Sequence, residues 1–132
     1  MPQIANITIK KNDGVTDVVY TAVVPSAGDK SPAVWRNLTV GTAAGHRPEA
    51  RLTSRANGTG TARRMDGSYS YPTLVTDTTG KTQVADRFNL QITGVIPLGM
   101  PDADLNEAVS QALNFFAAQL PKDSFKSGYA PT

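Results

Sequence analysis

Apolar residues recur at about every second position up to Pro97, in segments separated by Gly, Pro, Asn and Asp. A period of two is the spacing of a β-strand with one buried face, and the separating residues are those that favour turns. After Pro97 the spacing changes, and Leu105, Val109, Leu113 and Phe116 recur at the intervals of a helix. The sequence therefore predicts an α+β fold in which six or seven antiparallel strands precede C-terminal helix.

Turn residues set the expected limits of the strands. Asp13-Gly14 and the segment 57–60, Asn-Gly-Thr-Gly, each join two apolar segments, as hairpin turns do. Pro72 is expected to interrupt a strand because proline cannot donate a ladder hydrogen bond. The polar segment 76–82 predicts a mobile loop, and residues 41–45 predict a loop of small residues. The expected strands are residues 3–10, 15–24, 33–40, 48–56, 61–71, a short strand ending near Val75, and 84–97.

The C-terminal segment predicts one long helix and a shorter one. Asp102 or Asp104 is expected to cap the first helix, with Glu107 completing a capping box, and Pro121 is expected to end it. A short second helix is expected around residues 123–126.

The long helix has more apolar surface than one small sheet can cover. Phe115 and Phe116 are adjacent, so their side chains point about 100° apart on a helix. A single helix would also leave strand edges open, and open edges favour pairing with another chain. Both features predict that the protein forms an oligomer.

Composition excludes several classes of protein. With 132 residues the chain predicts one domain, residues 1–132. It has no cysteine, and its only histidine, His46, has no partner for a nucleophilic or zinc site. We therefore expect no enzyme activity, no metal, no cofactor and no small-molecule substrate. No secretion signal or membrane-length apolar segment is visible, so no membrane association is expected.

Basic charge is concentrated near the middle of the chain. Between Arg47 and Arg64 five arginines stand against one glutamate, a local formal charge of +4, whereas the whole chain carries +2. Strand alternation places Arg51, Thr53 and Arg55 on one face and the intervening residues on the other. Such a face is typical of a surface that binds an anionic polymer, although an ordinary solvated sheet face has the same pattern.

The order of these segments resembles the coat proteins of small single-stranded RNA bacteriophages, the leviviruses. The resemblance covers almost the whole chain. It is carried by the N-terminal hairpin, the segment Val24-Pro25-Ser26 followed by a loop to Ala33-Val34-Trp35, the basic strand pair, the final strand ending in Ile96-Pro97, and the C-terminal helices.

The resemblance implies an N-terminal β-hairpin, a five-stranded antiparallel sheet, and two C-terminal helices that pack on a partner subunit's sheet. Intertwined homodimers would then assemble into an icosahedral shell around single-stranded genomic RNA. It implies a virion protein that assembles in the cytoplasm of a bacterial host. The segment 76–82 would match the loop that gathers around the symmetry axes of such shells.

The resemblance also implies a set of RNA-binding residues on the inward face of the sheet, where the family binds an RNA hairpin and represses translation. These residues are Arg51, Thr53, Arg55, Arg64, Asp66, Ser68, Asn89 and Gln91. Asn89 replaces a stacking tyrosine of the family, and Arg51 and Asp66 replace small hydroxyl residues. Two outcomes therefore stay open: recognition of the hairpin differs from that of the family, or it is lost. A slip of one residue between Gly58 and Pro72 would exchange the two faces.

The sequence leaves open one alternative to a coat protein, which belongs to another functional class. A small β-rich binding module that does not assemble into particles would have the same strands and turns. It predicts neither a particle nor nucleic acid that co-purifies with the protein.

Overall fold

The computed structural model describes residues 2–41 and 43–132. The expected loop at residues 41–45 includes Thr42, which lies outside the described residues. The chain divides into two compact units, Met1–Ile96 with the strands and Pro97–Thr132 with the helices.

The first unit is an antiparallel sheet of six strands in the order β1-β2-β3-β4-β5-β6, so every strand pairs with its neighbours in sequence. The strands are β1 (Ile7–Lys10), β2 (Asp17–Val24), β3 (Ala33–Arg36), β4 (Glu49–Asn57), β5 (Ala62–Thr76) and β6 (Thr82–Pro97), and a short 3-10 turn, η1 (Ala44–His46), precedes β4. The predicted α+β fold is confirmed. The strand count differs slightly from the expected five plus a hairpin, because β2 pairs with both β1 and β3 and makes the hairpin part of the sheet.

Both predicted hairpin turns are present, and β1–β2 has a turn built on one side chain. The Asp13 carboxylate accepts hydrogen bonds from the backbone N–H groups of Val15 and Thr16 at 2.9 and 2.8 Å. A hydrogen bond from the Thr16 hydroxyl, together with these two backbone bonds, lowers the pKa of Asp13 to about 2. The second turn closes between Asn57 and Ala62, which pair as the last residues of β4 and the first of β5.

Several strand limits differ from the expected ones, and two of these differences have a local cause. The predicted strand 33–40 ends at Arg36, because buried Asn37 turns the chain by accepting hydrogen bonds from the N–H and hydroxyl of Thr39. Pro72 does not interrupt β5. It lies beyond Ser70, the last residue that pairs with β4, so its missing N–H removes no bond from that ladder.

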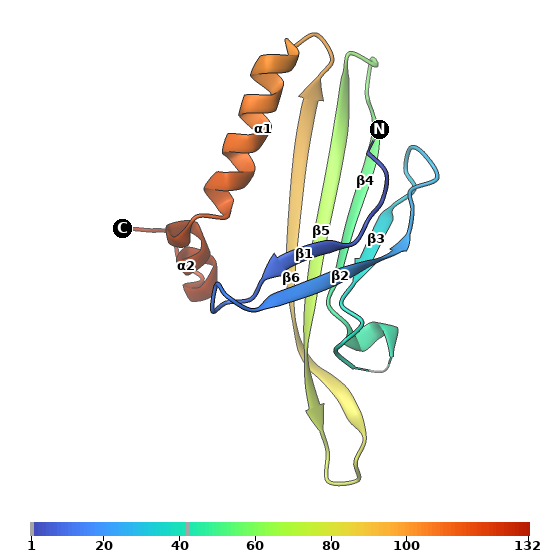
Figure 1. Cartoon of the computed structure of the whole chain (residues 1–132), viewed down its shortest axis with the longest axis vertical. Coiled ribbons are helices and arrows are strands. Elements are labelled where there is room, and N and C mark those ends of the chain that lie inside the picture. The colour runs from blue at the N-terminus through green and yellow to red at the C-terminus, as the bar shows by residue number, and fades with distance from the viewer. Residues whose placement is uncertain (1, 42) are drawn as a thin grey trace. The chain divides into compact units, whose positions relative to one another are not determined.

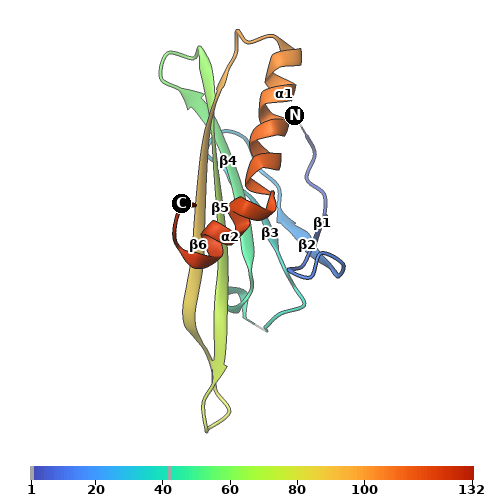
Figure 2. The ribbon, with the colours of Figure 1, turned by 90° about the vertical axis from the view of Figure 1, so that its left-hand side faces the viewer.

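The β1–β2 hairpin lies on one side of the long strands β4, β5 and β6 (Figures 1 and 2). Two contacts hold it there. The Tyr20 and Tyr69 hydroxyls are 2.7 Å apart, and the Trp35 indole N–H donates to the Ala5 carbonyl at 2.8 Å. Tyr20, Val34 and Trp35 form the buried apolar core, with Pro48 fully buried as well.

The second unit is a pair of helices, α1 (Asp102–Phe116) and α2 (Gln119–Ser127). The predicted capping box is wrong: Pro101 is the N-cap, and Glu107 instead accepts a hydrogen bond from Gln111 at 2.7 Å. Asp102 and Asp104 do lie in the first turn, where their charge suits the helix dipole. The ends also differ, because α1 stops at Phe116 and Pro121 lies in the first turn of α2. Proline is tolerated there because that N–H has no partner within the helix.

The loop between β5 and β6, predicted to be mobile, contains a turn centred on Asp77. The carboxylate accepts hydrogen bonds from the backbone N–H groups of Thr79 and Lys81, both at 2.9 Å. Mobility of this loop stays a prediction.

The tyrosine pair predicts how stability changes at high pH. Partial burial, the largest influence on both rings, raises the pKa of Tyr20 and of Tyr69 above 10, because ionisation would place a charge in a partly dry site. The folded state therefore keeps protons that the unfolded chain loses above its ordinary tyrosine pKa. Stability from this pair is complete below that value and is lost as pH rises through the folded pKa.

We expect the free energy of unfolding to fall more steeply with pH in the native protein than in Tyr69→Phe, measured by chemical denaturation between about pH 9 and pH 11. Equal slopes for the two proteins would contradict the paired-tyrosine account.

Candidate nucleic-acid interface

The register between β4 and β5 decides which side chains share a face. Arg51 lies opposite Ser68, Thr53 opposite Asp66, and Arg55 opposite Arg64. Residues opposite one another in an antiparallel pair project to the same side of the sheet. The structure therefore brings the six predicted site residues on these two strands to one face, and the one-residue slip did not occur.

Strand β6 extends this face, which we call the polar face. The Thr93 hydroxyl donates to Asp66 at 3.1 Å, and the Arg87 guanidinium donates to the Ser70 hydroxyl at 2.9 Å. Gln91 lies between them in the alternation of β6, and so does Asn89, which is exposed. Both predicted site residues of β6 therefore lie on the polar face.

An open hollow of about 420 Å³ lies at the centre of the polar face. Among the predicted site residues it is lined by Arg51, Thr53, Arg64, Asp66, Ser68 and Gln91. Arg55 and Asn89 are not among its lining residues. Sequence reasoning missed Lys30 and Pro32, which line the hollow from the loop between β2 and β3, and it did not include Thr93 in the site. Alternation within strands carries no information about where that loop folds.

Each of two carboxylates on the polar face is shared by two arginines. Glu49 Oε1 lies 3.1 Å from Arg36 Nη2 and 3.2 Å from Arg51 Nη2. Asp66 lies 3.2 Å from Arg64 Nε and 3.8 Å from Arg55 Nε. Five arginines, Arg36, Arg51, Arg55, Arg64 and Arg87, thus share a face with two carboxylates, which leaves a formal charge of +3.

Asp66 reduces the electrostatic repulsion between neighbouring arginines of the polar face. Arg55 and Arg64 are directly opposite each other, and like charges in that position repel. Desolvation is the largest single influence on Asp66 and acts to raise its pKa, but hydrogen bonds from Arg64 and Thr93 and the nearby arginine charges together lower the pKa below its usual value. Asp66 is therefore ionised at neutral pH, and it holds the two guanidinium groups side by side.

Arg63 belongs to the same basic segment but not to the same face. It lies opposite Ala56, pairs with Asp29 and donates to Ser54, all away from the polar face. The opposite face of the sheet is apolar, with Leu52, Leu90 and Ile92 around a second hollow of about 220 Å³. The apolar side chains of β6 on this face are only partly buried, since Phe88 and Ile92 are 47% and 49% exposed.

Within residues 2–41 and 43–132 no three His, Asp or Glu side chains form a cluster that could hold a metal ion. No helix in the described part of the chain is long and apolar enough to cross a membrane.

No protein-family model matches the chain, and no curated protein matches its sequence. Solved structures do match. The virus-like particle of bacteriophage NT-214 has a TM-score of 0.80 at 16% identity, covering 99% of this chain and 100% of that chain. The virus-like particle of Beihai levi-like virus 21 has a TM-score of 0.77 at 15% identity, with coverages of 99% and 98%. The capsid protein of bacteriophage GA has a TM-score of 0.76 at 17% identity, with coverages of 96% and 95%.

This chain has the coat-protein fold of levi-like bacteriophages. The resemblance seen in the sequence is therefore confirmed as a fold, over nearly the full length of both chains. Because the identities are low, the coat-protein fold is what these structures establish, and the roles of individual residues rest on the geometry of the polar face.

The ionisation of Asp66 provides a direct test of the arginine arrangement. We expect a pKa below 3.8 for Asp66 in the native protein and a value closer to 3.8 in Arg64→Gln, which removes one hydrogen bond and one charge. The measurement is an NMR pH titration of the aspartate side chains. Lys11→Gln is the matched control, because it removes one positive charge from the turn between β1 and β2 and should leave Asp66 unchanged. A titration of Asp66 that is insensitive to Arg64→Gln would contradict the shared ion pair.

Proposed function

We propose that this protein is a structural coat protein that forms homodimers and assembles into a closed icosahedral shell around single-stranded RNA. The observation that carries the proposal is the match of nearly the whole chain to proteins of phage virus-like particles. The protein would then be part of a virion, assembled in the cytoplasm of a bacterial host. Its role would be structural and not enzymatic.

The polar face supports RNA as the interior partner. Guanidinium groups bind phosphate oxygens with paired hydrogen bonds, and their charge releases counterions from the nucleic acid. A face with a formal charge of +3 would bind RNA with little regard to sequence. In this proposal Arg51, Arg55 and Arg64 contact phosphates, while Thr53, Ser68, Asn89 and Gln91 supply hydrogen-bonding groups for unpaired bases. Asp66 would act mainly by holding Arg55 and Arg64 in place.

Repression of translation through an RNA hairpin is a second possible role of the same face. It would require the polar hollow to accept a base. The side chains of Thr53, Ser68 and Gln91 line that hollow and could hydrogen-bond base edges. The arginines account for RNA affinity that does not depend on base sequence. Repression through one particular hairpin also requires side chains that recognise its bases.

The apolar surfaces support a dimer. Leu52 and Ile92 flank Gly67, where an added Cβ would lie only 3.2 Å from Leu52 Cδ2, so the glycine forms the floor of the apolar hollow. On α1 the rings of Phe115 and Phe116 meet edge to face with centroids 5.3 Å apart and are 62% and 56% exposed. We propose that the helices of a second copy cover the apolar face, so that strands and helices form a single coat-protein domain completed by its partner.

RNA content tests the interior role of the polar face. We expect Arg51→Gln, Arg55→Gln and Arg64→Gln together to leave the dimer folded and to reduce the RNA that purifies with the particles. Each phosphate contact contributes roughly 0.7 to the dependence of log K on log salt for single strands, so the slope for RNA binding should fall by about 2.

The matched control removes the same charge from Lys11 and Lys81, which lie in turns between strands, and from Lys122 of α2. This control should retain its RNA. Equal RNA content in the arginine variant and the native protein would refute the assignment of the polar face.

The dimer is tested by two neighbouring residues of β4 that point to opposite faces. We expect Leu52→Glu to abolish the dimer, because burying a leucine side chain stabilises an interface by roughly 1.5–3 kcal/mol and burying an unpaired charge is unfavourable. Thr53→Glu places the same charge on the polar face and should remain dimeric. Analytical ultracentrifugation in high salt, with circular dichroism to check folding, gives the measurement. A folded dimer of Leu52→Glu would show that this face is not the interface.

A further inference from the structure

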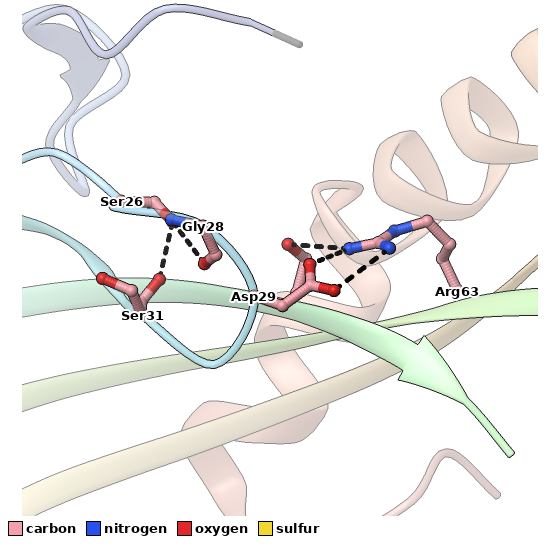
Figure 3. Close-up of polar contacts among 6 residues, drawn as sticks. Ser26, Gly28, Asp29, Ser31 and Arg63 are labelled. Atoms are coloured by element: carbon pink, nitrogen blue, oxygen red, sulfur yellow. Dashed lines mark hydrogen bonds and ion pairs between the residues drawn. The ribbon is translucent and has the colours of Figure 1, made fainter. Parts of the chain in front are cut away.

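The loop between β2 and β3, residues 25–32, is closed by its own hydrogen bonds. The Ser26 hydroxyl donates to the Ser31 carbonyl at 2.7 Å, and the Ala27 N–H donates to the Ser31 hydroxyl at 2.9 Å. The Ser31 N–H donates to the Gly28 carbonyl at 3.2 Å. Figure 3 shows the serines on the loop, with Asp29 directed toward Arg63. The loop is therefore a compact unit that can be fixed in place by a few outside contacts.

Two contacts fix it to the β4–β5 hairpin. Strand β3 pairs with β4 only as far as Leu52, and beyond that point the Lys30 N–H donates to the Ser54 carbonyl at 2.9 Å. Asp29 forms an ion pair with Arg63 of β5 (Figure 3). The hydrogen bond from Arg63 lowers the pKa of Asp29, so the pair is charged at neutral pH.

Lys30 has the backbone conformation that such anchoring imposes. Its φ is +66°, and it is the one residue other than glycine with positive φ in the described part of the chain. This conformation is unfavourable for a side chain with a Cβ and persists where neighbouring contacts determine it. The Asp29–Arg63 ion pair and the hydrogen bond from the Lys30 N–H to Ser54 supply those contacts.

Because of this conformation, the consecutive side chains of Asp29 and Lys30 lie on different sides of the sheet. Asp29 reaches Arg63, while Lys30 lines the hollow of the polar face together with Arg51, Thr53 and Arg64. Lys30 is exposed, and within residues 2–41 and 43–132 its ammonium group forms no hydrogen bond or ion pair, although its charge contributes to the lowered pKa of Asp29. Among the residues that line the hollow, Arg51 and Arg64 stand against Asp66, and Lys30 raises their formal charge from +1 to +2.

We propose that Lys30 is a further phosphate-binding residue of the polar face, and that Asp29 and Arg63 are positioning residues that hold it over the hollow. The proposal rests on the RNA-binding role proposed above. It gives the loop a specific function and explains why Arg63, within the basic segment, points away from the polar face: it anchors Lys30 in place of contacting RNA itself.

The direction in which Asp29→Asn changes RNA affinity distinguishes a positioning role of Asp29 from a purely electrostatic role. Asp29→Asn removes a negative charge, so electrostatics alone would tighten RNA binding. If Asp29 instead positions Lys30, the same substitution weakens binding. We expect Lys30→Gln to lower the salt slope by roughly 0.7 and to weaken binding at low salt, and Asp29→Asn to weaken binding as well. In the Lys30→Gln background, Asp29→Asn should cause no further loss.

The measurement is fluorescence anisotropy of a labelled single-stranded RNA oligonucleotide with the purified full-length protein at several salt concentrations. Lys11→Gln is the matched control for charge and should retain the native slope. The proposal is overturned if Lys30→Gln behaves like Lys11→Gln, or if Asp29→Asn tightens binding or leaves it unchanged. The variant without Arg51, Arg55 and Arg64 is measured alongside, because native binding by that variant would refute the RNA-binding face as a whole, whereas its loss of binding leaves the role of Lys30 to be judged separately.

Discussion

The antiparallel register between β4 and β5 is the constraint on which the rest of the structure depends. Side chains alternate between faces with a period of two, so a shift of one residue would turn every arginine of β5 to the other side. The tight turn after Asn57 fixes that register and places Arg51 opposite Ser68 and Arg55 opposite Arg64. The same register places Gly67 beside Leu52, which gives the opposite face its apolar hollow. One strand pairing thus creates a cationic surface and an apolar surface on opposite sides of the sheet.

The arginines of the cationic surface lie close together, and their mutual repulsion is reduced because each carboxylate pairs with two of them. Glu49 joins Arg36 and Arg51, and Asp66 joins Arg64 with Arg55. Exposed ion pairs of this kind contribute little to stability by themselves. Their effect is on geometry, because they hold guanidinium groups in fixed positions while leaving a net positive charge for an anionic polymer.

Much of this arrangement could be predicted from the sequence. Strict alternation in β4 identified the shared face of Arg51, Thr53 and Arg55. The order of strands, turns and helices predicted an α+β fold, and the coat-protein fold was implied by the resemblance to levivirus coat proteins. Helix limits were less predictable: Pro121 signals a break, but whether it ends one helix or lies in the first turn of the next depends on the chain before it. Pro72 was expected to interrupt a strand, and its effect depended on where the pairing with β4 ends.

The contribution of Lys30 could not be predicted, for a different reason. Its position follows from the contact of Asp29 with Arg63, residues far apart in the sequence, and no local pattern reports such a contact. Arg63 likewise could be assigned to a face only once the register of β5 was known. The position of a loop that is fixed by tertiary contacts cannot be predicted from the periodicity of the sequence.

The central claim is that this fold builds a shell around RNA. It is tested most directly by electron microscopy of the protein purified from a bacterial expression host, together with ultraviolet absorbance of the same fraction. We expect uniform closed particles whose absorbance at 260 nm exceeds that of protein alone, and we expect this excess to disappear when the RNA is extracted. A small species that is free of RNA at low salt would contradict the claim and would favour a β-rich binding module with the same fold.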